Sequence, residues 1–168
     1  MTTQTVYQFR TQLKKGVDHE AYLDSLFSDW FQIFHASESQ QRQGIDREFY
    51  RDEDGATKRY TVEYKADERA AQTGNAFIET ISVQPPPHQA WRPTKPGWAY
   101  TSRADILIYY NPGDRLIYII QFAKLRRLLP TWESKYRQVS VPNKDYTTHG
   151  LLVPLAELER IAEQTINL

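Results

Sequence analysis

Two segments in which polar and apolar residues alternate, 44–51 and 58–65, flank a short polar stretch. Successive side chains of a β-strand point to opposite faces. Glu63 and Lys65 therefore share one face of the second segment, and its aromatic and aliphatic residues share the other. The intervening stretch, 52–55, ends in glycine, as tight hairpin turns commonly do. This pattern predicts an antiparallel hairpin and fixes which residues of the two strands can meet.

Further strands are expected on both sides of the hairpin. A third strand is predicted over 76–83, after a Thr-Gly-Asn turn. The segments 104–110 and 115–122 are almost continuously apolar, which is typical of central strands buried on both faces. The turn Asn-Pro-Gly-Asp joins them. A last strand is expected at 151–154, whereas residues 5–13 have only weak β character.

Helices are predicted to accompany these strands. Asp18 is a suitable N-cap for an amphipathic helix over 19–36, in which large apolar residues recur at helical spacing. A later helix with a shorter apolar stripe is expected to end at Pro130, and a final helix that begins at Pro154 is expected to continue through Gln164. The order of elements predicts an α/β fold, a mixed central sheet flanked by helices, in a single domain that covers all 168 residues.

The composition excludes several classes of function. Basic and acidic residues number 21 each, so polybasic binding is excluded as a property of the whole chain. Because there is no cysteine, a disulfide, a thiolate nucleophile and a zinc knuckle are excluded as well. No apolar run reaches the roughly 20 residues of a membrane span, and the first residues lack the apolar core of a signal peptide. We therefore expect a cytoplasmic protein.

Carboxylates gather around the predicted hairpin. Asp46 lies on the strand beside Glu63 and Lys65, and Glu79 on the third strand is expected to reach the same place. Carboxylates suit Mg²⁺, a hard cation that also binds water and phosphate oxygens, and the backbone carbonyl of Tyr64 offers another oxygen. A lysine at such a site can orient or help deprotonate the attacking water, or stabilise charge on phosphoryl oxygens. The alternative is that these residues form the solvated, charged face of a hairpin.

Asp46 in Gly-Ile-Asp, together with Glu63 and Lys65 in Val-Glu-Tyr-Lys, resembles the motif of the PD-(D/E)XK nuclease superfamily, the restriction-endonuclease-like phosphodiesterases. The Thr-Gly-Asn-Ala-Phe-Ile-Glu segment that follows, and the later Gly-Trp-Ala-Tyr-Thr-Ser-Arg segment, resemble branches of the same superfamily. The resemblance extends over about residues 20–125. It departs from the family pattern at Ile45, where proline would precede the aspartate.

This resemblance implies a restriction-endonuclease-like core with Mg²⁺ or Mn²⁺ held by Asp46 and Glu63. It implies that Lys65 assists the attacking water and that a nucleic-acid phosphodiester is hydrolysed to leave a 5′-phosphate. Some members of the superfamily add an acidic residue from a helix. In this sequence Asp29 is the first candidate for that residue and Asp24 is the second.

A basic segment, 122–144, contains six basic residues and one acidic residue. The region of the hairpin, 46–68, contains eight acidic and five basic residues. A neutral chain is therefore expected to place a basic ridge beside an acidic pocket, and such a ridge would bind the phosphate backbone of a nucleic acid, DNA rather than RNA. A homodimer is compatible with the sequence. The predicted phosphate contacts are Lys124, Arg126, Arg127 and Arg103.

Two other functions are open on the sequence alone. The chain could be a catalytically silent, nuclease-like module that binds nucleic acid or a protein partner. It could also be a structural protein that assembles through the loop at 85–103, which is rich in proline and tryptophan. A charged face that is simply solvated remains the alternative to the basic ridge.

Overall fold

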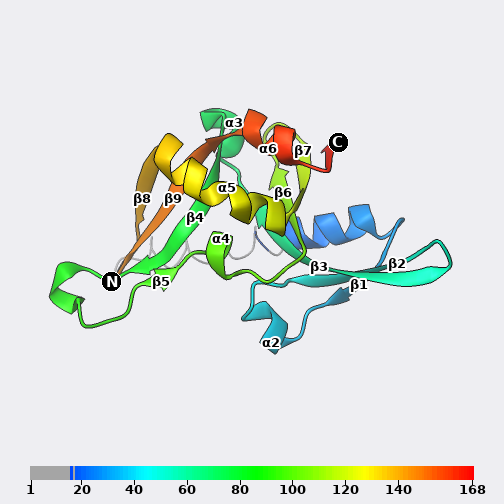
Figure 1. Cartoon of the computed structure of the whole chain (residues 1–168), viewed down its shortest axis with the longest axis horizontal. Coiled ribbons are helices and arrows are strands. Elements are labelled where there is room, and N and C mark those ends of the chain that lie inside the picture. The colour runs from blue at the N-terminus through cyan, green and yellow to red at the C-terminus, as the bar shows by residue number, and fades with distance from the viewer. Residues whose placement is uncertain (1–15, 17) are drawn as a thin grey trace.

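A computed structural model describes residue 16 and residues 18–168 of the chain. The weak β segment expected at 5–13 lies outside the described residues. The predicted α/β fold is confirmed, with a mixed central sheet and flanking helices (Figure 1). Among the described helices, none is long and apolar enough to cross a membrane.

The larger sheet has six strands in the order β1-β2-β3-β6-β7-β10. The predicted hairpin is confirmed as β2 and β3, which pair antiparallel, and the two apolar strands are confirmed as β6 and β7. β6 lies parallel to β3, whereas every other pair in this sheet is antiparallel. The strand bounds are β1 Gln32–His35, β2 Arg47–Glu53, β3 Ala56–Ala66, β6 Ile106–Asn111, β7 Leu116–Gln121 and β10 Gln164–Asn167.

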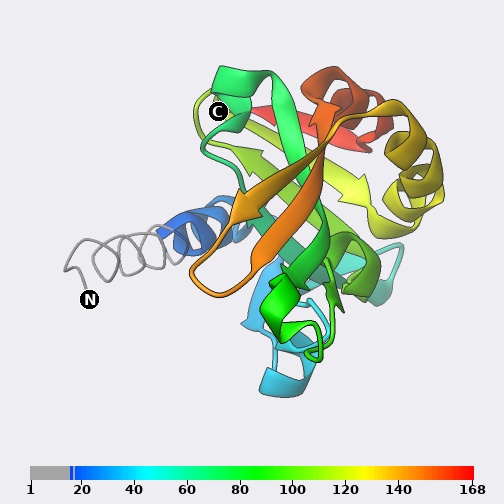
Figure 2. The same cartoon turned by 90° about the vertical axis from the view of Figure 1, so that its left-hand side faces the viewer.

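The third predicted strand, β4, does not extend the hairpin. It belongs to a separate four-stranded antiparallel sheet with the order β5-β4-β9-β8, which crosses in front of the six-stranded sheet in Figure 2. The hairpin cannot accept β4 because β6 already occupies the free edge of β3. The last predicted strand is part of β9. The bounds are β4 Asn75–Gln84, β5 Lys95–Pro96, β8 Gln138–Pro142 and β9 Thr147–Pro154.

The two faces of the six-stranded sheet are covered differently. The N-terminal helix, described at 18–27, packs Leu23 and Phe27 against one face. The other face contacts α5, α6 and the four-stranded sheet, and the larger buried core lies between them (Figure 1). The remaining helices are short. The bounds are α2 Glu38–Gln41, α3 Ala70–Thr73, α4 Trp98–Thr101, α5 Phe122–Lys135, α6 Leu155–Ile161 and a 3-10 turn at Pro87–Gln89.

The helix predicted over 19–36 is wrong in its second half. Residue 18 is already helical, so Asp18 is not its N-cap, and the helix ends at residue 27. β1 follows and pairs with β2, and Phe31 packs against Phe49 with ring centroids 5.0 Å apart. Trp30 and Phe34 are more than half exposed, as they would not be on the buried stripe of a continuous helix. A helix followed by a strand can imitate helical spacing when both bury residues on one side.

Two expectations about the C-terminal third are also wrong. α5 continues through Pro130 to Lys135 because Leu129 and Trp132 keep packing into the core on both sides of the proline, and this burial offsets the cost of a helical proline. The final helix begins after Pro154 as expected, but it ends at Ile161. The chain then forms β10, which pairs with β7.

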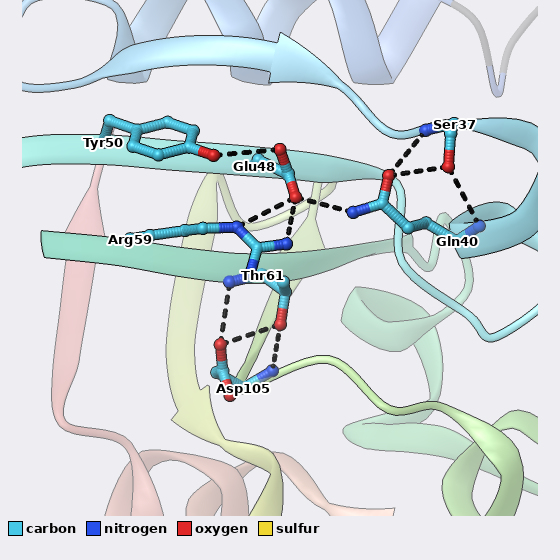
Figure 3. Close-up of polar contacts among 7 residues, drawn as sticks. All are labelled: Ser37, Gln40, Glu48, Tyr50, Arg59, Thr61 and Asp105. Atoms are coloured by element: carbon cyan, nitrogen blue, oxygen red, sulfur yellow. Dashed lines mark hydrogen bonds and ion pairs between the residues drawn. The ribbon is translucent and has the colours of Figure 1, made fainter.

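A polar network ties α2 to the outer face of the hairpin (Figure 3). Glu48 on β2 accepts hydrogen bonds from Gln40 of α2 (2.6 Å) and Nε of Arg59 on β3 (2.9 Å), and the Tyr50 hydroxyl donates to its other oxygen. Ser37 caps α2, and its backbone N–H donates to the side chain of Gln40. The carboxylate of Glu48 therefore links α2, β2 and β3 through side-chain hydrogen bonds.

Replacing Glu48 with glutamine is expected to lower the free energy of unfolding by about 1 kcal/mol at pH 7. The hydrogen bond from Arg59 lowers the pKa of Glu48 from its usual 4.5. A carboxylate with a lowered pKa stabilises the fold above its unfolded pKa, and this contribution is lost as the pH falls through its folded pKa. The difference between wild type and Glu48→Gln should therefore shrink at pH 3, as measured by urea denaturation. Glu159→Gln, at an exposed position, is the control, and an equal loss at both pH values would contradict the prediction.

Candidate active site

Asp46 sits immediately before β2, where its carboxylate is held by the backbone of β3. Its N–H donates to the carbonyl of Val62 (2.8 Å), and the N–H of Tyr64 donates to its Oδ2 (2.8 Å). In a strand, the N–H and C=O of one residue point to the same side. The carbonyl of Tyr64 therefore lies on the same edge of β3 as Asp46, as the sequence predicted.

Glu63 and Lys65 lie opposite Leu107 and Tyr109 of β6, so both face the side on which the four-stranded sheet packs. Nζ of Lys65 and Oε1 of Glu63 form an ion pair of 2.6 Å. Glu63 is buried, whereas about a third of the Lys65 side chain is exposed. The pair therefore presents its lysine, not its glutamate, toward solvent.

The second oxygen of Glu63 is enclosed by backbone. Oε2 is buried and has no hydrogen-bond partner among the described residues. A Cβ on Gly44 would lie 2.6 Å from this oxygen, and Gly44 has a φ of +69° that other residues rarely adopt. The hydroxyl of Ser102 donates to the carbonyl of Gly44 (2.7 Å) and so fixes the glycine against the glutamate. Gly44 is required here by both its backbone conformation and the close approach of the carboxylate.

Glu79 reaches Lys65 from the other sheet. Its Oε1 accepts a hydrogen bond from the N–H of Trp98 (3.3 Å), and Nζ of Lys65 lies 5.7 Å from the centroid of the Trp98 ring. The backbone at Gly97 passes so close to Glu79 that a Cβ there would lie 2.4 Å from the Glu79 carbonyl. The structure thus brings Asp46, Glu63, Lys65 and Glu79 into one neighbourhood, although Glu79 belongs to a different sheet from the one predicted.

Burial and the neighbouring charges together shift the pKa values of Glu63, Lys65 and Glu79. Burial raises the pKa of Glu63 and that of Glu79, and the Lys65 ammonium opposes both shifts. Burial alone would lower the pKa of Lys65, but the ion pair with Glu63 and the negative charges of Asp46 and Glu79 outweigh it and raise the pKa. Lys65 is therefore a cation at neutral pH, suited to holding anionic groups.

Lys65 is accessible from two sides. One cleft of about 650 Å³ is lined by Lys65, Phe77 and Trp98, together with residues of α3 and β8. A second cleft of about 560 Å³ is lined by Lys65, His19 and residues 64–69. Lys65 is therefore the member of the charged cluster that lines both clefts.

The two helix acids proposed from the resemblance do not join this cluster. Both oxygens of Asp24 bind the guanidinium of Arg47, and Oδ1 also accepts from the Tyr64 hydroxyl (3.0 Å). Asp29 is exposed in the turn after the helix, next to Trp30. The expectation that Asp24 or Asp29 adds a ligand is not supported by where the structure places them.

The predicted phosphate contacts fall into two groups. Arg127 and Arg103 are exposed. Lys124 pairs with Glu163 (3.4 Å), and Arg126 donates to the carbonyl of Ser102 and lies over the Phe122 ring. Arg126 is therefore a structural link between α5 and the loop beside Glu63, and its role as a free phosphate contact is corrected accordingly.

The candidate metal site offers two carboxylates, those of Asp46 and Glu63. Within the described residues, no group of three or more histidine, cysteine or acidic side chains is placed to hold a metal ion. Asp46, Glu63 and the carbonyl of Tyr64 are the oxygens that could hold a hard cation, with water and substrate completing its shell. The buried Oε2 of Glu63, which lacks a hydrogen-bond donor, fits a cation because a buried anionic oxygen otherwise goes unsatisfied.

Sequence reasoning missed the residues that support the cluster. Gly44 carried a weak signal, since it stands two residues before Asp46 in the motif. Ser102 and Trp98 carried none, because their contacts with Gly44 and Lys65 depend on how distant segments pack.

Comparisons with known proteins give one fold similarity. No protein-family model matches the chain, and no curated protein matches it either. Among solved structures, a bacterial homing endonuclease, I-Ssp6803I, is similar with a TM-score of 0.45 and 17% sequence identity, over 70% of this chain and 72% of that one.

Proposed function

We propose that the chain is a Mg²⁺- or Mn²⁺-dependent nuclease of the PD-(D/E)XK type that hydrolyses phosphodiester bonds of nucleic acid, with DNA as the substrate. The observation that carries this proposal is the ion pair of Glu63 and Lys65 on β3, with Asp46 anchored on the same strand by the Tyr64 N–H. These are the three residue types of the sequence motif, and two clefts are lined by Lys65.

Asp46 and Glu63 would hold the cation, together with the carbonyl of Tyr64. The bound cation would supply Lewis-acid stabilisation of charge on the phosphoryl oxygens and at the attacking water. Hydrogen bonds to β3 fix Asp46, the ion pair with Lys65 holds Glu63, and the backbone of Gly44 encloses its second oxygen, so we expect little reorganisation of either carboxylate during the reaction. This rigidity favours a site that is formed before the substrate arrives.

Lys65 acts in this proposal as a positioned cation. Its raised pKa keeps the ammonium protonated, so it orients the attacking water and stabilises a phosphoryl oxygen instead of accepting a proton. Glu79 approaches Lys65 from the four-stranded sheet, and the hydrogen bond from the Trp98 N–H holds its carboxylate there. Burial raises the pKa of Glu79 above its usual value, and the Trp98 N–H and the Lys65 ammonium oppose this shift.

Purified protein is expected to cut a fluorescent 30-base-pair DNA duplex or a 30-nucleotide single strand in Mg²⁺ or Mn²⁺, and not in EDTA. The products should carry 5′-phosphates, which a ligase assay detects. Mn²⁺ binding measured by calorimetry gives a readout that does not depend on activity, and Glu63→Gln should weaken it at least about tenfold. A wild-type protein that cuts neither DNA nor RNA with either metal would contradict the proposal.

A further inference from the structure

We infer that the loop of residues 85–95, here called the Trp91 loop, binds the substrate strand beside the cleavage site by stacking a nucleobase on Trp91. This inference rests on the proposed function and adds to it where the flanking part of the nucleic acid lies. It concerns a part of the molecule that lies outside the cluster of Asp46, Glu63, Lys65 and Glu79.

Trp91 is presented to solvent by an ordered loop. Its side chain is 82% exposed, the largest exposure among the exposed large apolar residues of the described chain. The loop begins with three consecutive prolines and contains a 3-10 turn. Backbone N–H groups of Gln89 and Arg92 donate within the loop, and Arg92 also donates to the Gln89 side chain (2.7 Å). A flat apolar ring on a preorganised loop loses little conformational entropy when a base stacks on it.

The charge of this region suits a polyanion. Between Glu79 and Asp105 the sequence has no acidic residue, and it contains Arg92, Lys95 and Arg103. Lys95 and Arg103 are exposed. A nucleic-acid strand offers both chemistries that the loop can bind, because its phosphates attract the cations and its bases stack on the indole. An apolar protein surface would satisfy the tryptophan and leave these cations without a counterpart.

Both ends of the loop lead directly to the site. On one side β4 carries Glu79, and its last residue, Gln84, lies about 17 Å further along the strand. On the other side β5 pairs with β4 and leads to Gly97 and Trp98, which contact Glu79. The loop projects at the opposite end of the molecule from the β2–β3 turn (Figure 1). The loop begins after Gln84, and the span of about 17 Å to that residue already corresponds to about five base pairs of duplex, so Trp91 would contact the flank of the substrate.

A neighbouring hairpin completes the surface. The tip between β8 and β9, at 143–147, lines a small cavity of about 190 Å³ together with Pro86, His88 and Gln89 of the loop. The tip therefore lies beside the Trp91 loop, and Tyr146 on it is a second exposed aromatic residue.

The test measures binding of the full chain to two fluorescent DNA probes in EDTA, a 30-nucleotide single strand and a fully paired 30-base-pair duplex. Trp91→Ala is expected to raise Kd for the single strand at least about fivefold, as loss of one base stack requires, whereas Trp91→Phe should stay close to wild type. Trp30→Ala is the matched control, because Trp30 is also exposed but lies beside the helix and β1. An equal loss on the duplex would indicate that the ring also inserts between paired bases.

Cleavage kinetics give the second readout. Because Trp91 lies on the flank, Trp91→Ala should raise KM with little change in kcat. If Trp91→Ala binds and cleaves DNA as the wild type does, the inference is overturned and the proposed function still stands. A lower molecular mass of Trp91→Ala by sedimentation would also overturn it, since the ring would then belong to a protein interface. A wild type that binds neither probe would overturn the inference, and its failure to cut DNA or RNA would separately contradict the proposed function.

Discussion

Replacing Asp46 with asparagine is expected to reduce Mg²⁺-dependent cleavage by about a thousandfold while changing the free energy of unfolding by less than about 1 kcal/mol. The amide oxygen of asparagine can still accept the hydrogen bond from the N–H of Tyr64, so the local fold is retained. In the proposed function, what is lost is the negative charge that would attract a divalent cation. The measurement is kcat/KM on a fluorescent DNA duplex, together with chemical denaturation at pH 7.

Asp105→Asn is the matched control for this variant. Asp105 also accepts hydrogen bonds from β3, through the N–H (2.9 Å) and hydroxyl (2.8 Å) of Thr61, as Figure 3 shows. Its replacement should leave cleavage within about threefold of wild type. Equal losses in the two variants would mean that activity depends on anchoring of β3 and not on the charge of Asp46.

Replacing Arg47 with alanine is expected to lower the free energy of unfolding by about 3–5 kcal/mol. Arg47 is 4% exposed, and its guanidinium binds Asp24 (2.9 Å), Glu20 (3.0 Å) and the carbonyl of Asp46 (2.9 Å). Without the guanidinium, Asp24 keeps a charge in a largely buried position with no cation beside it. Urea denaturation at pH 7 measures the loss.

Two further variants define the cause of that loss. Arg51→Ala removes a guanidinium that is about half exposed and paired with Glu53, so it should cost less than about 1 kcal/mol. Arg47→Lys keeps the charge but cannot bind Asp24 with two parallel hydrogen bonds, so its stability should lie between those of wild type and Arg47→Ala. A loss below 1 kcal/mol in Arg47→Ala would show that the buried network contributes little to stability.

The local pattern of the sequence was sufficient for the hairpin and for the core of the site. Alternation placed Glu63 and Lys65 on one face, and antiparallel pairing brought Asp46 beside them. These relations depend only on the period of a strand and on a short turn. Two of the turn residues, Asp54 and Gly55, have positive φ, which explains why the turn could be predicted from its glycine.

The long-range features could not be predicted in the same way. The sequence does not encode which strand occupies the free edge of β3, and β6 rather than β4 does so. Acidic residues counted around the hairpin suggested an open negative pocket, but Glu48 and Glu53 are engaged by arginine and lysine side chains. Charge counting cannot distinguish a free carboxylate from one that is already paired in the fold.

The parallel pairing of β3 with β6 has a consequence for how the site is assembled. Parallel neighbours require a crossover, and here the crossover contains β4, β5 and α4, and with them Glu79 and Trp98. During synthesis the hairpin can form as soon as residue 66 has emerged, yet Lys65 acquires its full surroundings only after β6 has docked. A nascent chain would therefore form the hairpin with Asp46, Glu63 and Lys65 before Glu79 and Trp98 come to lie beside Lys65, and the candidate site would be completed only when most of the fold exists.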